Sequence, residues 1–111
     1  MVDITIRPAA GRYTIRAKGA IIGETARAVE LIEGARAPVI YVPREDVAMA
    51  FLDRSDRVTT CPYKGEASYY SVVTPEGRIE NAVWSYEQPK AGAKGIAGYL
   101  AFYPEVTVQK V

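Results

Sequence analysis

ASYYSVVTPEGRIENAVWSY, residues 67–86, has the pattern of two β-strands joined by a tight turn. Both halves are rich in β-branched and aromatic residues, which strands favour. Between them, Pro75 presets the turn entry and Gly77 can take the left-handed conformation of a three-residue connection. We therefore predict a β-hairpin in which Thr74 faces Arg78.

The register of this hairpin decides which side chains share a face, because side chains alternate along a strand. It pairs Val72 with Glu80, Tyr70 with Ala82, and Ser68 with Trp84. One face is then expected to carry Tyr70, Val72, Glu80, Ala82, Trp84 and Tyr86. The opposite face is expected to carry Tyr69, Ser71, Val73, Ile79, Asn81 and Val83, and a glycine bulge would shift the register locally.

Glu80 is the acidic residue on the predicted face of Tyr70 and Trp84. A buried carboxylate there needs a partner, for which Lys64, Arg44 or a tyrosine hydroxyl is available. Loss of solvent would raise its pKa, which suits a general acid or base. The alternative is a surface glutamate on a solvent-facing sheet.

The rest of the chain predicts short strands separated by turns. Apolar and polar residues alternate, or short apolar runs lie between glycines and prolines. We expect strands at 2–7, 13–15, 20–24, 28–33, 39–42, 58–61 and 106–111, a charged turn at 53–57, and a loop at 88–95 with room for one helical turn. Residues 96–103 fit either a strand or a short buried helix, and we assign a strand.

Only residues 43–52 show a helical period, with Pro43 suited to a first turn and Glu45 and Asp46 suited to the positive end of a helix dipole.

The length of 111 residues is that of one domain. The fold class that we expect is a single compact antiparallel β domain over residues 1–111, with one short α-helix near 43–52.

Composition excludes several classes of function. Lys and Arg number 14 and Asp and Glu number 13, and they are scattered, so we expect no nucleic-acid partner. The N-terminus lacks the features of a targeting segment, and the longest apolar stretches are shorter than the ~20 residues that span a bilayer. We therefore expect a soluble, cytoplasmic protein with no membrane partner.

The chain has one cysteine and no histidine. An intrachain disulfide, a Cys/His zinc site and every Ser-His or Cys-His catalytic pair are excluded. We predict no metal and no cofactor. Any proton transfer must use Asp, Glu, Lys, Tyr or Cys.

TTCPYKGEASYY, residues 59–70, is the richest segment for chemistry. Pro62 and Gly65 build a tight bend that can bring Cys61, Lys64 and Glu66 together. An ammonium near a thiol favours the thiolate, and a carboxylate can move protons. The alternative is that the cysteine packs as a small apolar residue and the lysine points to water.

Eight tyrosines and one tryptophan can be interpreted in two ways. Aromatic residues on an open sheet can stack nucleobases. The basic stripe and RNP-type motif that would accompany such a platform are missing, which favours a role in the core or in an interface. Isolated glycines such as those of GRIEN and GIAG form no phosphate-binding loop.

Four stretches in order resemble the family known as domain of unknown function 427. They are YVPREDV at 41–47, TTCPYKGEASYY at 59–70, ENAVWSYEQP at 80–89 and IAGYLAFYPEV at 96–106. Family members commonly carry histidines just ahead of the cysteine, where this chain has Arg57 and Thr60.

This resemblance implies a compact all-β domain of the β-tent type, similar in architecture to methionine sulfoxide reductase B and small zinc-binding domains, whose zinc cysteines are absent here. A nucleotidyltransferase label is sometimes attached to the family, but the chain lacks the Asp pair and Gly-Ser signature of that reaction. The matching positions, where we expect a shared pocket, are Tyr41, Pro43, Arg44, Asp46, Cys61, Pro62, Lys64, Gly65, Tyr69, Glu80, Asn81, Trp84 and Tyr86.

Three hypotheses follow, and whether the protein is an enzyme stays open among them. The first is a small-molecule pocket with catalytic candidates Cys61, Lys64 and Glu80 and lining candidates Tyr41, Arg44, Glu66, Tyr70, Asn81, Trp84 and Tyr86. The second is a non-catalytic interaction or oligomerisation module, as a monomer or a homo-oligomer. The third is a nucleotide-related enzyme.

Overall fold

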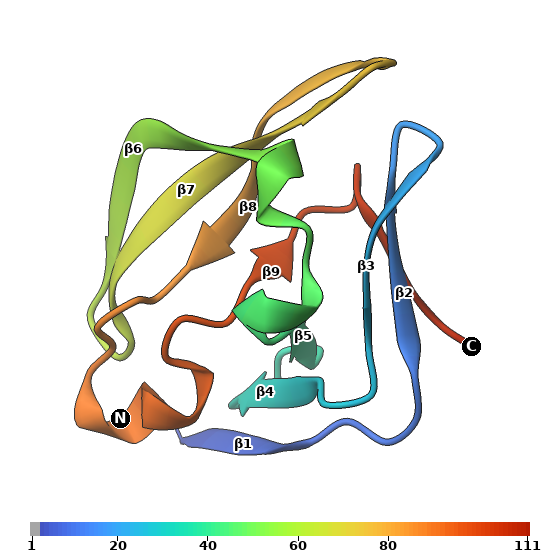
Figure 1. Cartoon of the computed structure of the whole chain (residues 1–111). Coiled ribbons are helices and arrows are strands. Elements are labelled where there is room, and N and C mark those ends of the chain that lie inside the picture. The colour runs from blue at the N-terminus through green and yellow to red at the C-terminus, as the bar shows by residue number, and fades with distance from the viewer. Residues whose placement is uncertain (1–2) are drawn as a thin grey trace.

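Ten short strands form three antiparallel sheets in the computed structural model, which describes residues 3–111 (Figure 1). The strands are β1 (Ile4–Pro8), β2 (Tyr13–Ala17), β3 (Ala20–Thr25), β4 (Val29–Glu33), β5 (Val39–Tyr41), β6 (Leu52–Cys61), β7 (Gly65–Thr74), β8 (Gly77–Ser85), β9 (Ala101–Phe102) and β10 (Thr107–Lys110). Three 3₁₀ helices complete the described chain: η1 (Arg44–Asp46), η2 (Met49–Phe51) and η3 (Ala91–Ile96). The predicted mainly β, antiparallel fold is confirmed.

The sheets have the strand orders β1-β4-β5, β10-β2-β3 and β6-β7-β8-β9. In Figure 1 the first lies at the bottom, β2 and β3 run along the right, and β6 to β8 lie at the upper left. One isolated bridge, Val42 with Leu100, links the chain next to β5 with the chain next to β9, and another joins Gly23 of β3 to Val47. The three sheets therefore enclose the interior from different sides.

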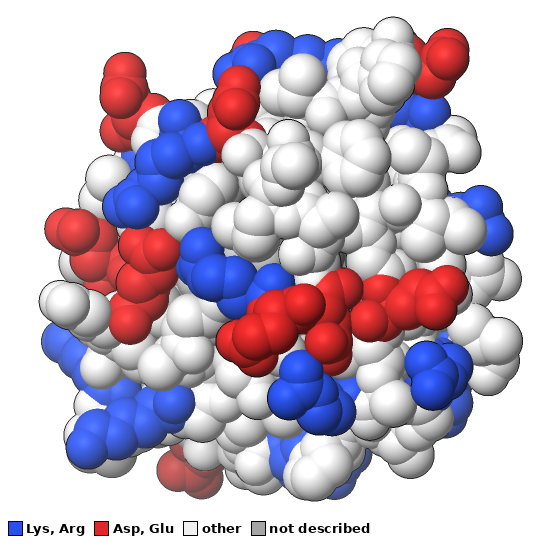
Figure 2. All heavy atoms as spheres, in the orientation of Figure 1, with Lys and Arg blue, Asp and Glu red and all other residues white. Residues whose placement is uncertain are grey.

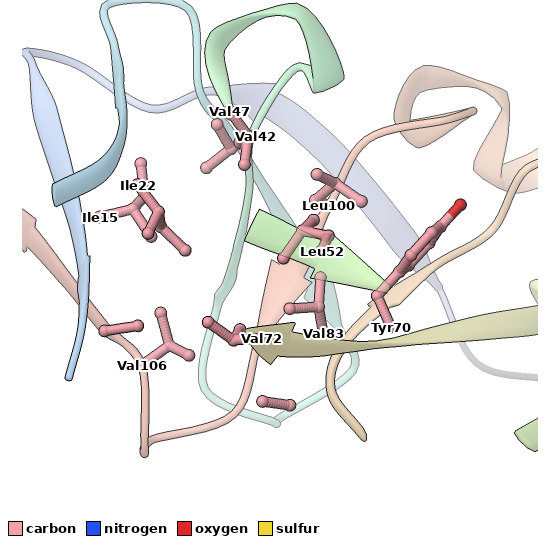
Figure 3. Close-up of a cluster of buried hydrophobic side chains, with 12 residues drawn as sticks. Ile15, Ile22, Val42, Val47, Leu52, Tyr70, Val72, Val83, Leu100 and Val106 are labelled. Carbon is pink, nitrogen blue, oxygen red and sulfur yellow. The ribbon is translucent and has the colours of Figure 1, made fainter. Parts of the chain in front are cut away.

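Strand β7 is buried on both faces, because each face meets a different hydrophobic core. The first core, shown in Figure 3, comprises Ile15, Ala17, Ile22, Val42, Val47, Leu52, Tyr70, Val72, Ala82, Val83, Leu100 and Val106. The second comprises Leu31, Tyr41, Ala67, Tyr69, Tyr86, Ala93, Ile96 and Ala101. Consecutive residues of β7 thus face different surroundings.

Three segments differ from the sequence-based expectation. Residues 43–52 form η1 and η2 instead of one α-helix. The charged segment 53–57 belongs to β6, whose register shifts between Arg54 and Val58, so that a bulge stands where we expected a turn. Residues 96–103 supply only the two-residue strand β9. The predicted first strand began at Val2, which lies outside the described residues.

The register of the β7–β8 hairpin also differs from the prediction. Thr74 pairs with Gly77, because its hydroxyl accepts the Glu76 N–H at 3.2 Å and donates to the Gly77 carbonyl at 3.2 Å. Further along, residues 80–82 of β8 lie opposite the single residue Ser71. The hydroxyl of Ser71 accepts the Asn81 N–H at 3.0 Å, which fixes this bulge.

The shift at the turn exchanges the faces of the β8 side chains, whereas the bulge adds two residues and keeps their alternation in phase. Tyr70 pairs with Val83, and Tyr69 pairs with Trp84. Because paired residues point to the same face, Trp84 shares its face with Tyr69 and not with Tyr70. The predicted face that combined Tyr70, Glu80 and Trp84 is therefore wrong.

Asn81 gives a direct test of the bulge, because its φ of 51° lies in the left-handed region. Asn81→Val should lower the free energy of unfolding by about 1–3 kcal/mol, since a β-branched residue is strained there. Asn81→Gly should keep the stability within about 1 kcal/mol, because glycine adopts this conformation freely. Urea denaturation followed by fluorescence of the single tryptophan measures both, and equal stabilities would contradict the assigned bulge.

Candidate functional site

A cavity of about 240 Å³ lies between the β4–β5 pair and the β7–β8 hairpin. Its lining residues are Leu31, Glu33, Arg36, Ala37, Val39, Tyr41, Lys64, Tyr69, Trp84, Tyr86 and Tyr103. Pockets for drug-sized ligands have volumes of about 300–1,000 Å³, so this one suits a smaller molecule.

Strand alternation brings the lining residues together. Leu31 and Glu33 are two residues apart on β4, and Val39 and Tyr41 are two residues apart on β5. Leu31 pairs with Val39, so the four side chains share one face. The β7–β8 hairpin supplies the facing wall through the pair Tyr69 and Trp84.

Aromatic rings hold each other in place around Trp84. Its indole Nε1 donates to the Tyr41 hydroxyl at 3.1 Å, and the two rings meet edge to face with centroids 6.3 Å apart. On its other side, the Tyr103 ring centroid lies 4.8 Å from that of Trp84. These contacts fix the ring orientations, which makes the wall of the cavity pre-formed.

Lys64 and Glu33 form a buried ion pair at the cavity. Lys64 Nζ lies 2.5 Å from Glu33 Oε1, and the side chains are only 10% and 12% exposed. The ammonium also lies 5.7 Å from the centre of the Tyr86 ring. The Lys64 carbonyl accepts the Lys90 N–H at 2.9 Å, which fixes the turn that directs the lysine inward. Burying an ion pair costs desolvation energy. Both residues of this pair line the cavity, where their charged groups can contact a bound molecule.

Cys61 is half-buried at the start of the same turn and pairs with Gly65. Burial by itself would raise the pKa of the thiol. The backbone N–H groups of Tyr63 and Lys64 and the Lys64 ammonium outweigh that effect, so the pKa of Cys61 lies below its ordinary value. The sulfur therefore has more thiolate character than an ordinary cysteine.

Tyr41 and Tyr86 are kept protonated by their burial. Removal from solvent raises the pKa of Tyr41 to about 12, and it also raises the pKa of Tyr86. Tyr86 is only 7% exposed, and no side-chain hydrogen bond among residues 3–111 involves its hydroxyl. Both hydroxyls thus remain neutral donors at the cavity.

Tyr69 is a further lining residue of the cavity. Its hydroxyl lies 2.9 Å from Thr59 Oγ1, and the Arg57 guanidinium lies 4.9 Å from the ring centre. Burial would raise the pKa of Tyr69, but hydrogen bonds with Thr59, Tyr103 and Arg57 lower it overall. Tyr69 is therefore the more acidic tyrosine of the cavity wall.

The predicted site residues are distributed over three places. Tyr41, Lys64, Trp84 and Tyr86 line the cavity, and Cys61 lies beside Lys64. Glu66 is exposed on β7, and Asn81 lies in the β8 bulge. Arg44 and Tyr70 lie on the other face of β7.

Glu80 is not the buried carboxylate that one hypothesis required. Its side chain is 66% exposed and lies 2.6 Å from Arg78 Nε, with Ser71 Oγ at 3.1 Å from the second oxygen. Hydrogen bonds from Arg78 and Ser71 lower the pKa of Glu80. The register change moves it off the face of Tyr70, so it is a surface residue with an ion-pair partner.

Arg44 contacts an internal carboxylate, Glu87. Its guanidinium donates to Glu87 Oε2 at 3.1 Å and to the Tyr70 hydroxyl at 2.9 Å, and that hydroxyl donates to the same oxygen at 2.9 Å. Arg54 lies 3.3 Å from the other oxygen. Burial would raise the pKa of Glu87, but Tyr70, Arg54 and Arg44 lower it. This network stabilises the fold instead of forming a second open site.

The sequence did not indicate Glu33, Arg36 and Tyr103 as lining residues, whereas Tyr69 is one of the family-motif positions at which a pocket is expected. Glu33 carries a weak signal, because it ends the strand pattern of AVELIE two residues after Leu31. Its partner Lys64 is 31 positions away in the sequence, so no local pattern predicts their contact.

Two further features bear on the class of site. No group of His, Cys, Asp and Glu within the described chain is arranged to hold a metal ion. No helix of residues 3–111 has the length and apolar character needed to cross a bilayer.

The fold and the cavity define a small antiparallel β domain with an aromatic pocket. Residues 5–111 match the family described as Domain of unknown function (DUF427), and the chain belongs to this family. The resemblance seen in its four motifs is thereby confirmed. No curated protein matches the chain.

The buried ion pair can be tested by single and double substitutions. Lys64→Met and Glu33→Gln should each lower the free energy of unfolding by about 3 kcal/mol, because each leaves an unpaired buried charge. The double variant should lose less than the sum. As a control, Glu30→Gln should cost under about 1 kcal/mol, since the Arg7–Glu30 pair has the same 2.5 Å contact but Arg7 is 59% exposed. Additive effects would contradict the pairing.

The lowered pKa of Cys61 can be measured as the pH dependence of its alkylation by iodoacetamide. The Lys64→Met/Glu33→Gln variant should shift the profile to higher pH and slow alkylation several-fold at neutral pH, because the ammonium is lost. Lys94→Met removes an exposed charge and should leave the profile unchanged. Superimposable profiles of the wild type and the double variant would show that Lys64 does not act on the thiol.

Proposed function

We propose that this domain binds a small molecule in the cavity between β4–β5 and β7–β8, in the cytoplasm. The observation that carries the proposal is the Lys64–Glu33 pair, buried to about nine-tenths and facing a cavity walled by Tyr41, Trp84 and Tyr86. Pre-formed aromatic walls with a few converging polar groups are the usual anatomy of a ligand site. A lone free cysteine fits a reducing compartment.

Cys61 gives this site a route to chemistry. Its lowered pKa and its position beside Lys64 suit a nucleophile or a redox thiol, with the lysine as electrostatic activator. Glu33, rather than Glu80, is the carboxylate next to that lysine and the candidate for proton transfer. Catalysis then requires a ligand whose reactive atom reaches the sulfur.

The two other functions make different demands on the surface. An interaction module would use exposed apolar residues, and the large ones among residues 3–111, such as Ile21, Val58 and Tyr63, lie on β3, on β6 and after Cys61. A nucleotide-related enzyme would need groups for phosphates. Acidic and basic side chains are interspersed on the face shown in Figure 2, which favours neither function over the pocket.

The single tryptophan makes the proposal directly testable, because Trp84 lines the cavity. A screen of metabolites, nucleotides included, should yield a ligand that changes Trp84 fluorescence, raises the melting temperature and slows alkylation of Cys61. Val39→Phe should abolish these responses, because the added ring fills the cavity. Val111→Phe adds the same ring at an exposed position outside the cavity lining and should preserve them.

The outcomes separate the three functions. A ligand that stabilises the protein without protecting Cys61 would support binding without covalent chemistry. If no compound in the screen changes the Trp84 fluorescence or the melting temperature, and Cys61 is alkylated slowly, the proposal is overturned in favour of an interaction module. A nucleotide that alone gives all three responses would assign the pocket to nucleotide chemistry.

A further inference from the structure

We propose that the ligand of this cavity is a small planar carboxylate, whose oxygens accept hydrogen bonds from the hydroxyls of Tyr41 and Tyr86 and from the Lys64 ammonium. This inference rests on the proposed function and names the class of ligand for the same pocket.

The first argument is the supply of free donors. Tyr41 accepts the Trp84 indole N–H through its oxygen, so its own proton is left for another acceptor. Tyr86 is 7% exposed and lines the cavity, and no side-chain hydrogen bond among residues 3–111 involves its hydroxyl. Lys64 carries three protons, of which the contact with Glu33 Oε1 uses one.

The second argument is that these donors stay protonated. Burial raises the pKa of Tyr41 to about 12 and raises that of Tyr86 as well. A neutral phenol that lines the cavity without a protein acceptor keeps its proton free for a ligand. A charged ligand oxygen would accept a stronger hydrogen bond than a neutral one.

The third argument is the balance of charge around the cavity. Lys64 and Arg36 line it, and the Arg57 guanidinium lies 4.9 Å above the ring of Tyr69 on its wall. Glu33 is the acidic residue of the lining. Three cationic groups against one carboxylate favour an anion.

The fourth argument is shape. Trp84 contacts Tyr41 edge to face and Tyr103 at an interplanar angle of 56°, so flat rings form much of the wall. A cavity of about 240 Å³ admits a single ring or a conjugated chain with its acid group. Planar ligands gain most from such walls because their faces stack.

Benzoate, benzamide and benzylamine are matched probes, because they share a ring and differ in the charge of one group. Trp84 fluorescence and saturation-transfer NMR on the intact chain would give their dissociation constants. Benzoate should bind at least about tenfold more tightly than the other two. Tyr86→Phe should weaken benzoate by about tenfold, and Tyr13→Phe, which alters a tyrosine outside the cavity, should leave it unchanged.

The results distinguish this inference from the function on which it rests. Equal or tighter binding of benzamide or benzylamine, or benzoate affinity that Tyr86→Phe does not change, would overturn the carboxylate assignment and leave the pocket standing. If none of the three probes binds, the carboxylate assignment is also overturned. If, in addition, no compound of the metabolite screen binds, the proposed function is overturned as well.

Discussion

The register of the β7–β8 hairpin, set at its turn by the pairing of Thr74 with Gly77, is the constraint on which the site depends. Ser71 Oγ accepts the Asn81 N–H, and Asn81 adopts a left-handed backbone, so residues 80–82 occupy the space of one. This bulge adds two residues, so it keeps the alternation of β8 in phase, and the one-residue shift at the turn is what puts the β8 side chains on the face opposite to that predicted. Trp84 consequently joins Tyr69 at the cavity, and Glu80 is left on the surface.

The two faces of β7 then take different roles. On one face, Tyr70 lies at the edge of the aliphatic core, with its hydroxyl pointing away from the other side chains in Figure 3. That hydroxyl meets Arg44 and Glu87, so the polar groups there satisfy one another. On the other face, the polar groups meet a cavity, and no side-chain hydrogen bond among residues 3–111 involves the Tyr86 hydroxyl. This difference is the reason for our proposal that the second face binds a ligand.

Much of the fold could be predicted from local pattern, and the site only in part. The strands at 20–24, 28–33 and 39–42 follow from apolar runs between turn residues, and the bend after Cys61 follows from Pro62 and Gly65. The bulge could not be predicted, because asparagine tolerates a left-handed backbone without requiring it. The Lys64–Glu33 contact joins two different sheets. It depends on tertiary packing, which the periodicity of apolar residues in the sequence does not predict.

The most direct measurement is a nuclear Overhauser spectrum of the folded protein, because one tryptophan gives one indole N–H signal. The indole Nε1 lies 3.1 Å from the Tyr41 hydroxyl, so this proton should show cross-peaks to the Tyr41 ring and none to the Tyr70 ring. Cross-peaks from Trp84 to Tyr70 would mean that the hairpin has the register in which Thr74 faces Arg78. In that case the cavity as described would not exist.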